Sequence, residues 1–307
     1  MDKKEEFLNK LAKIEPKIRK YHHYMNDKFS SKLIRVFIVG KKSILKGYSI
    51  LIEKIFNKDF KKEVKTFWRR SMEVYLADRM SSGLYFFGVL HGEELKIVKF
   101  LIKNFKENDN FYDIGANYGF YTLLAQEFIT KGEIHAFEPL PKIFEILEKN
   151  AQIKKFKNTF LNQIALYDKN GEIEFYAPTS TFNTGDGSLI PHKKCNKRFK
   201  TIRVLTQKLD SYILNHQPPT IMKIDVEGAE PYVLRGGINL IKNFQPIIIM
   251  EYFNDNLHNE AINFLLEHSY RMFKLTEEGD LVLLNDNEIQ KIFDGKVKPE
   301  ANYVFKK

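Results

Sequence analysis

The stretch NFYDIGANYGF, residues 110–120, joins a short apolar run to a carboxylate and two glycines. The aromatic and β-branched residues around Asp113 are typical of a buried strand. Gly115 allows the tight turn that must follow this strand, and Gly119 lets a helix at 120–128 pack close to the sheet. We therefore expect a strand, a turn and a helix start that together hold one end of a nucleotide-like cofactor.

Asp113 separates two classes of cofactor. A dinucleotide would place its pyrophosphate over the turn, and two unit charges about 4 Å apart interact by about 4 kcal/mol at an effective dielectric of 20, which is repulsive here. S-adenosylmethionine (SAM) has no phosphate and presents an ammonium group, which a carboxylate attracts. The turn also lacks the middle glycine of the dinucleotide fingerprint. The motif therefore favours a SAM site, and a purely structural turn is the alternative.

A second carboxylate, Glu138, ends the strand-like segment 133–138. It follows the glycine turn by roughly 20 residues, the spacing at which an acid on the neighbouring strand binds the ribose of an adenosine. We expect Glu138 to bind the two ribose hydroxyls, and the alternative is a solvated acid at a strand end. The prolines that follow predict a helix at 142–151.

The segment KIDVEGAE, Lys223 to Glu230, ends a further predicted strand at 220–225. Asp225 lies at the end of this strand. If an alcohol accepts the methyl group of SAM, it must lose a proton, and we expect Asp225 to be the general base that removes it. Lys223 shares its face of the strand, and Glu227 follows closely, so both would set the charge state of Asp225. His192 and His258 are alternative bases.

The same acidic residues have other interpretations. Asp225, Glu227 and Glu251 are hard oxygen ligands that would suit magnesium and orient a diol, so a divalent metal is the alternative to a simple base. For Glu230 we favour an acid at a helix start, where the helix dipole attracts negative charge.

The stretch TSTFNTGDGSLIPH, residues 179–192, is polar and contains glycine, which is typical of a loop. Such a loop would close over an acceptor and offer Asn183, Ser188 and His192 as hydrogen-bonding groups. An ordinary surface loop is the alternative.

These motifs together resemble the FkbM-type SAM-dependent methyltransferases. The resemblance covers roughly residues 75–252 and rests on DIGANYG, FEP, ALYDKNGEIEF, GSL and KIDVEGAE. The family's threonine-leucine-aspartate is spaced differently here, as Thr206, Leu209 and Asp210. The resemblance implies methyl transfer to a carbohydrate hydroxyl, on a glycan, sugar nucleotide or lipid-linked saccharide, with a polyketide-like acceptor as the alternative. It adds SAM contacts from Ala116, Asn117, Pro139, Ala165 and Asp225, and acceptor contacts from Tyr85, Glu94 and Glu251.

The alternation of strands and helices predicts the fold class. Strands are expected at 111–114, 133–138, 159–166, 220–225, 246–252, 270–275 and 280–284, and helical patterns alternate with the earlier ones. This order predicts a doubly wound, Rossmann-like α/β sheet with helices on both faces and its ligand at the carboxyl ends of the strands. By the resemblance, the last two strands form an antiparallel edge.

Charge locates a domain boundary. Residues 1–70 contain 20 Lys and Arg against 8 Asp and Glu, a net charge of +12, whereas the whole chain has +10. We therefore predict a basic helical extension at 1–66, with one helix near its start and another at 33–55, and a methyltransferase domain at 67–307. The extension would pack on the domain, bind an anionic membrane surface or bind a protein. Its aromatic residues form no stacking motif, which argues against nucleic acid.

Composition agrees with a cytoplasmic enzyme, soluble or peripheral at a membrane. The single cysteine, Cys195, excludes a disulfide within the chain and gives no zinc signature. The start MDKKEEFLNK lacks the apolar core of a secretory signal, and no apolar run approaches the roughly 18 residues of a membrane span.

A catalytically silent SAM-fold scaffold and a dinucleotide oxidoreductase are the rival classes of function. Asp113, Glu138 and Asp225 together argue against the first, and Asp113 argues against the second.

Overall fold

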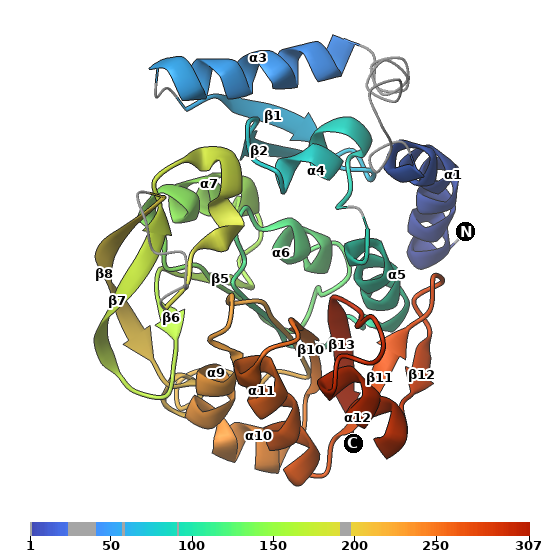
Figure 1. Ribbon diagram of the computed structural model, residues 1–307, viewed down its shortest axis with the longest axis vertical. Coiled ribbons are helices and arrows are strands. Elements are labelled where there is room, and N and C mark those ends of the chain that lie inside the picture. The colour runs from blue at the N-terminus through green and yellow to red at the C-terminus, as the bar shows by residue number, and fades with distance from the viewer. Residues whose placement is uncertain (1, 24–40, 57–58, 91, 191–197) are drawn as a thin grey trace. The chain divides into compact units, whose positions relative to one another are not determined.

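The computed structural model describes residues 2–23, 41–56, 59–90, 92–190 and 198–307 (Figure 1). It divides into two compact units, one of residues 1–95 with 180–185 and one of residues 96–179 with 186–307. The division lies later in the chain than the boundary after residue 66 that the charge distribution suggests, and the domain assignment itself stays a prediction.

The first unit contains the amino-terminal helices and a two-stranded sheet. Its elements are α1 (Lys3–His23), α3 (Lys41–Phe56), β1 (Lys61–Lys65), β2 (Ser71–Tyr75) and α4 (Ser81–Phe87). The apolar face of α1 is buried, and the ring of Phe7 packs against Phe67 and Trp68. The predicted first helix is therefore present. The second is described only from residue 41, and β1 lies inside the segment expected to be helical.

The second unit is built on an eight-stranded sheet with the order β12-β11-β13-β10-β9-β3-β4-β5. Strands β5, β4, β3, β9 and β10 are parallel, and β13 is antiparallel to both of its neighbours. Chain order reverses between β3 and β9, and ligands of open α/β sheets bind at the carboxyl ends beside such a reversal. The strands are β3 (Phe111–Ile114), β4 (Ile134–Phe137), β5 (Thr159–Asn162), β9 (Ile221–Ile224), β10 (Ile247–Glu251), β11 (Arg271–Leu275), β12 (Leu281–Leu283) and β13 (Asn302–Lys306).

Helices cover both faces of this sheet, so the predicted doubly wound fold is confirmed. Tyr112, Met222 and Ile248 point into one core with α8 (Leu209–Tyr212), α9 (Glu230–Gly236), α10 (Ile238–Phe244), α11 (Asn256–Glu267) and α12 (Asp286–Phe293). Figure 1 shows α9, α10 and α11 side by side. The other face carries α5 (Glu94–Asn104), α6 (Phe120–Ala125) and α7 (Pro141–Ala151), with Leu147 of α7 packed on Ala136.

Two features of the sheets differ from the expectation. β11 and β12 pair antiparallel as expected, but β13, which the sequence analysis missed, lies between β10 and β11. The single strand expected at 159–166 is divided into β5 and β6 (Ala165–Leu166). β6 belongs to a separate three-stranded sheet with β7 (Gly171–Pro178) and β8 (Phe199–Gln207).

The described part of the predicted acceptor loop contains a short 3₁₀ helix, η1 (Thr181–Asp186), and a β-bridge between Tyr176 and Ser188. Residues 191–197 lie outside the described part of the chain, so His192 and Cys195 are not placed. Among the helices that the structure does describe, none combines the length and the apolar character needed to cross a bilayer.

Candidate functional site

The turn after β3 packs directly against the ends of its two neighbouring strands. Gly115 has φ +84°, and a Cβ atom added to it would lie 1.9 Å from the carbonyl oxygen of Asp225. The N–H groups of Gly115 and Ala116 donate to the carbonyl oxygen of Phe137 at 3.0 and 2.9 Å. A side chain at residue 115 would separate the turn from β9, so glycine is required here.

Glu138 ties this turn to the tip of β4. Its Oε2 atom accepts a hydrogen bond from the N–H of Asn117 at 3.0 Å, and its Oε1 atom accepts one from the N–H of Leu140 at 2.9 Å. Burial raises the pKa of Glu138 to about 7, although both backbone hydrogen bonds act in the opposite direction. Each carboxylate oxygen retains a lone pair for a further donor, which fits the two hydroxyls of a ribose.

Asp113 is more enclosed than the sequence suggests. Its carboxylate is 1 % exposed and accepts a hydrogen bond from the hydroxyl of Thr122 at 2.6 Å. Burial raises the pKa of Asp113, and the ammonium group of Lys223, its neighbour on β9, opposes the rise. Thr122, which the sequence analysis missed, lies in the first turn of α6. The contact between Asp113 and a cofactor ammonium stays a prediction.

Gly119 directly precedes α6, as its N-cap residue, with φ +84°. A Cβ atom added to it would lie 2.5 Å from the Cδ1 atom of Leu147, so the close approach that glycine allows is to α7 rather than to a strand.

Lys223 and Asp225 form a partly buried ion pair at the end of β9. The Nζ atom of Lys223 lies 2.6 Å from the Oδ2 atom of Asp225 and 4.9 Å from the ring centre of Tyr121. Burial alone would raise the pKa of Asp225, but the charge and hydrogen bond of Lys223 hold it below the ordinary value. Asp225 is therefore ionised at neutral pH. Tyr121, which faces the ammonium, was also missed from sequence.

Glu227 and Glu251 complete a cluster of three carboxyl groups with Asp225. One oxygen of each lies within 4.8 Å of the others. Burial, followed by the charge of Asp225, raises the pKa of Glu227 to about 9 and that of Glu251 well above its ordinary value. The protonated carboxyl of Glu251 then donates to Asp225. At neutral pH the cluster holds one negative charge, on Asp225.

Ser188 holds the backbone beside this cluster. Glu227 has φ +54°, and the hydroxyl of Ser188 donates to its carbonyl oxygen at 2.6 Å. The same hydroxyl accepts the N–H of Ile190 at 2.9 Å. Ser188 is thus buried and bound to the backbone, and its expected contact with an acceptor stays a prediction.

Glu230 and His258 lie behind the cluster. Glu230 begins α9 and accepts the N–H of Val226 at 3.0 Å, which agrees with its interpretation as a helix-start acid. The two ring nitrogens of His258 face Asp255 at 2.7 Å and Glu230 at 3.4 Å. Because His258 is 1 % exposed and its Nδ1 atom is held by Asp255, it is poorly accessible to an acceptor.

The remaining predicted residues are spread over several elements. Pro139 lies between β4 and α7, and Ala165 is buried in β6. Tyr85 is in α4, and Glu94 begins α5; both belong to the first compact unit. Their roles, like those of the other predicted contacts, stay predictions.

Comparison with known protein families assigns this chain to a family. The methyltransferase FkbM domain family matches residues 113–272, more than half of the chain. The chain therefore belongs to the FkbM methyltransferase family, and the resemblance seen in the sequence motifs is confirmed.

Two relatives and one solved structure are similar to this chain. The hexuronic acid methyltransferase AglP of Haloferax volcanii is 27% identical over 163 residues, 52% of this chain and 62% of AglP. Methyltransferase 1 of Beauveria bassiana is 25% identical over 152 residues, 43% of this chain and 59% of that protein. The chain thus spans about three-fifths of the length of these relatives. The crystal structure of an FkbM methyltransferase from Methylobacillus flagellatus is 12% identical, with a TM-score of 0.43, over 97% of this chain and 60% of that one.

Proposed function

We propose that this protein transfers the methyl group of SAM to a hydroxyl group of a carbohydrate, such as a glycan, sugar nucleotide or lipid-linked saccharide. Membership of the FkbM family supports the reaction class. The similarity to a hexuronic acid methyltransferase supports a carbohydrate acceptor over the polyketide-like alternative. The observation that carries the proposal is the contact of the Gly115 turn with Asp225, because it brings the expected cofactor turn beside an ionised carboxylate.

The residues around the turn fit SAM in chemistry. Glu138 offers two acceptor oxygens for the ribose hydroxyls. Bound SAM supplies a methyl group on a positively charged sulfur, which leaves as a neutral thioether. We assign the remaining cofactor contacts to Asp113, Ala116, Asn117, Pro139 and Ala165.

Asp225 is the residue that we assign as general base. It is ionised at neutral pH, whereas its neighbours Glu227 and Glu251 are protonated, so it is the carboxylate of this cluster that is able to accept a proton. Lys223 fixes the position of its carboxylate. Alignment of the acceptor oxygen with the methyl group contributes the larger share of the rate enhancement, because bound geometry lowers the activation barrier by roughly 7 to 11 kcal/mol.

A magnesium ion held by Asp225, Glu227 and Glu251 is the second candidate for the same step. The spacing of the three carboxyl groups favours it, because oxygens within 4.8 Å of one another need little movement to bind one cation. A cation would also favour the ionised forms of Glu227 and Glu251. The ion would bind the acceptor oxygen and lower the pKa of its hydroxyl.

The proposal is tested by incubating the purified protein with labelled SAM and a panel of sugar nucleotides and glycans, with polyketide-like alcohols in parallel. Transfer of label to a sugar hydroxyl is the expected result. Transfer to the polyketide-like alcohols alone would show that the acceptor is a polyketide-like molecule and not a carbohydrate. SAM binding without transfer to any acceptor would favour a silent scaffold, and binding of NAD without SAM would overturn the cofactor assignment.

For the amino-terminal extension we propose attachment to an anionic membrane surface through α3. Ile44, Tyr48 and Leu51 follow one another at helical spacing and are more than half exposed. On another face of α3, the ammonium group of Lys46 donates to the carbonyl oxygens of Leu76 and Asp78. The exposed apolar face and the net charge of +12 in residues 1–70 together suit an anionic surface.

A further inference from the structure

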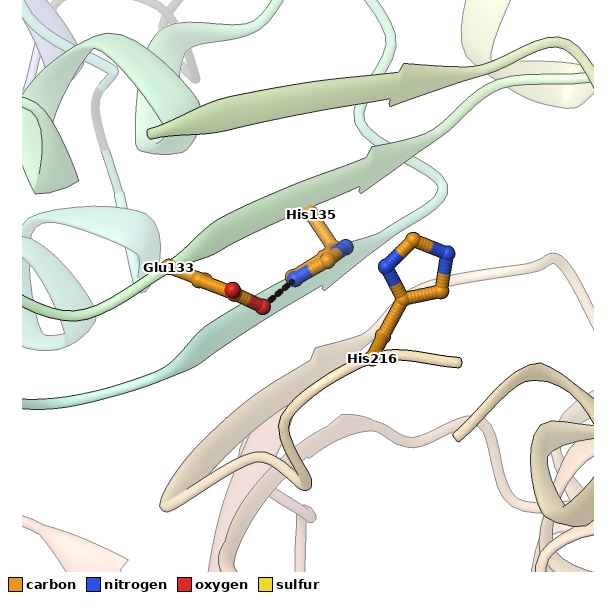
Figure 2. A group of neighbouring side chains, drawn as sticks. All are labelled: Glu133, His135 and His216. Carbon is orange, nitrogen blue, oxygen red and sulfur yellow. Dashed lines mark hydrogen bonds and ion pairs between the residues drawn. The ribbon is translucent and has the colours of Figure 1, made fainter. Parts of the chain in front are cut away.

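A second cluster of ligand-type side chains lies toward the amino-terminal ends of β4 and β9, away from the carboxyl-end site. Glu133 precedes β4, His135 lies on β4, and His216 lies between α8 and β9. Figure 2 shows the three side chains turned toward one another. One possible ligand atom of each lies within 4.8 Å of the other two.

Hydrogen bonds on the far side of His135 determine where its proton lies. The Nδ2 group of Asn162 donates to the carbonyl oxygens of Ala136 and Phe160, so the Oδ1 atom of Asn162 is an acceptor. The hydroxyl of Tyr212 donates to this atom at 3.1 Å. The oxygen of Tyr212 therefore accepts a hydrogen bond from the Nδ1–H group of His135, at 2.8 Å.

This arrangement leaves a lone pair on the Nε2 atom of His135. That atom lies 3.0 Å from the Oε2 atom of Glu133, so two acceptors face each other unless a cation lies between them. A second proton on the ring would place a positive charge on a side chain that is fully buried, which costs free energy.

We propose that Glu133, His135 and His216 bind a zinc ion. Two imidazoles and one carboxylate are a known donor set for zinc, and the fourth position would be taken by water, because Glu133 and His216 are both partly exposed. Ligand atoms about 2.1 Å from a tetrahedral zinc lie about 3.4 Å from one another. The pair of His135 and Glu133 is close to this spacing, so the main adjustment falls on His216.

Further contacts would hold these ligands in place. A histidine that binds a metal usually donates its other N–H to a fixed partner, and Tyr212 is such a partner for His135. The N–H of Gln217 donates to the Oε2 atom of Glu133 at 3.3 Å. The ring of His216 stacks on Tyr212 at 4.3 Å. The ion would join the segment before β9 to β4, and its position at the amino ends of the strands gives it a stabilising role rather than one in methyl transfer.

The test uses the full chain without an affinity tag, freed of metal and titrated with Zn²⁺ by calorimetry and with Co²⁺ by visible absorption. We expect one ion per chain, a Co²⁺ spectrum of low-symmetry coordination and a higher Tm with Zn²⁺. His216→Ala and Glu133→Gln should each weaken binding by at least about tenfold, because each removes a ligand.

His268→Ala is the matched control. His268 is also partly exposed and its ring stacks on Phe264 at 4.4 Å, but no group of three ligands includes it in the described chain. It should bind Zn²⁺ as the unaltered protein does, and SAM affinity should be the same in all three variants, which reports that each is folded. Absence of binding to the unaltered protein, or equal binding by His216→Ala and Glu133→Gln, overturns the proposal.

Discussion

The Nζ atom of Lys223 lies 2.6 Å from the Oδ2 atom of Asp225 and faces the ring of Tyr121. Lys223 is 3 % exposed, so this ammonium group has lost most of its water and its charge acts strongly on the carboxylate. Lys223 thus keeps the carboxylate of Asp225 ionised at the end of β9, while the neighbouring Glu227 and Glu251 stay protonated. Asp225 is therefore charged at neutral pH while Glu227 and Glu251 are neutral, a difference that variants can test.

Asp225→Asn should lower turnover by roughly a hundredfold or more, because it removes the base, while SAM affinity changes by only a few fold. Glu227→Gln is the matched control. Its pKa of about 9 makes Glu227 neutral near pH 7, and glutamine is a neutral group of the same shape, so turnover should stay within about fivefold. Fixed-time assays with labelled SAM measure the turnover of both variants. Turnover that survives in Asp225→Asn would transfer the role to His192 or His258.

Metal removal separates the base from the magnesium alternative. If Asp225 acts alone, turnover at pH 7.5 should be the same with EDTA and with added Mg²⁺. If the three carboxylates hold magnesium, EDTA should abolish turnover, Mg²⁺ should restore it, and Glu227→Gln should be as inactive as Asp225→Asn, because each removes a ligand. Agreement of the chelation and variant results is required for either assignment.

Glu138 should make cofactor binding depend on pH. Its pKa is raised from 4.5 to about 7, so the folded protein favours the protonated acid. Ribose hydroxyls prefer the carboxylate, and SAM affinity should therefore increase with pH, being about tenfold weaker at pH 6 than at pH 8. Calorimetry across this range measures it. Glu138→Ala should weaken SAM by roughly 1 to 3 kcal/mol and remove the pH dependence. An unchanged slope in the variant would contradict the assignment.

The same shift has a consequence for stability, with the sign opposite to that of an acid in a salt bridge. Between pH 4.5 and about 7 the folded state binds more protons at Glu138 than the unfolded state, so the free energy of unfolding falls as pH rises through this window. The loss reaches at most about 3 kcal/mol and is constant above the window. Urea titrations of the unaltered protein and Glu138→Ala should show the difference.

Gly115→Ala tests the contact between the turn and β9. Its Cβ atom would meet the carbonyl oxygen of Asp225 at 1.9 Å, so the turn must move. Gly92→Ala is the control, because Gly92 has a similar φ of +74° but nothing within 4 Å of an added Cβ. We expect Gly115→Ala to be less stable than Gly92→Ala by about 2 kcal/mol and to lose most SAM affinity, as measured by thermal unfolding and calorimetry. Equal losses of stability in the two variants would mean that the positive φ, and not the contact with Asp225, causes the destabilisation.

The membrane proposal is tested by sedimentation with vesicles containing phosphatidylserine. The protein should pellet at low salt and be released as the screening length falls from about 10 Å at 0.1 M toward 3 Å at 1 M. Replacing Ile44, Tyr48 and Leu51 by serine should reduce pelleting. Replacing Leu205, Leu214 and Phe244, which are similarly exposed, should not. Equal pelleting of both triple variants would reject a role for α3.

Local pattern predicted much of the sheet and the residues at its strand ends. The strands β3, β4, β9 and β10 fall within one residue of their expected bounds, because each is a short apolar run bounded by polar or turn-forming residues. Gly115 was expected to form a turn, and its φ of +84° agrees. The shared face of Lys223 and Asp225 follows from the two-residue period of a strand and is seen as their ion pair.

Other features depended on residues that are far apart in the chain. The sequence analysis did not include β13, although Tyr303, Val304 and Phe305 favour a strand, and its place between β10 and β11 is decided by pairing with strands more than 25 residues earlier. Glu227 and Glu251 are neutral because they are buried beside the charge of Asp225. No local sequence pattern encodes this arrangement.

The sequence by itself determined the family, the fold class and the strand-end acids, since these follow from periodicity and short motifs. Only the tertiary structure decided which acid of the cluster is ionised. It also decided that His135 and His216, 81 residues apart in the chain, lie close together. The physical reason is that charge state and ligand geometry depend on distance in space and on exclusion of water, and both are set when the strands pair and the helices pack.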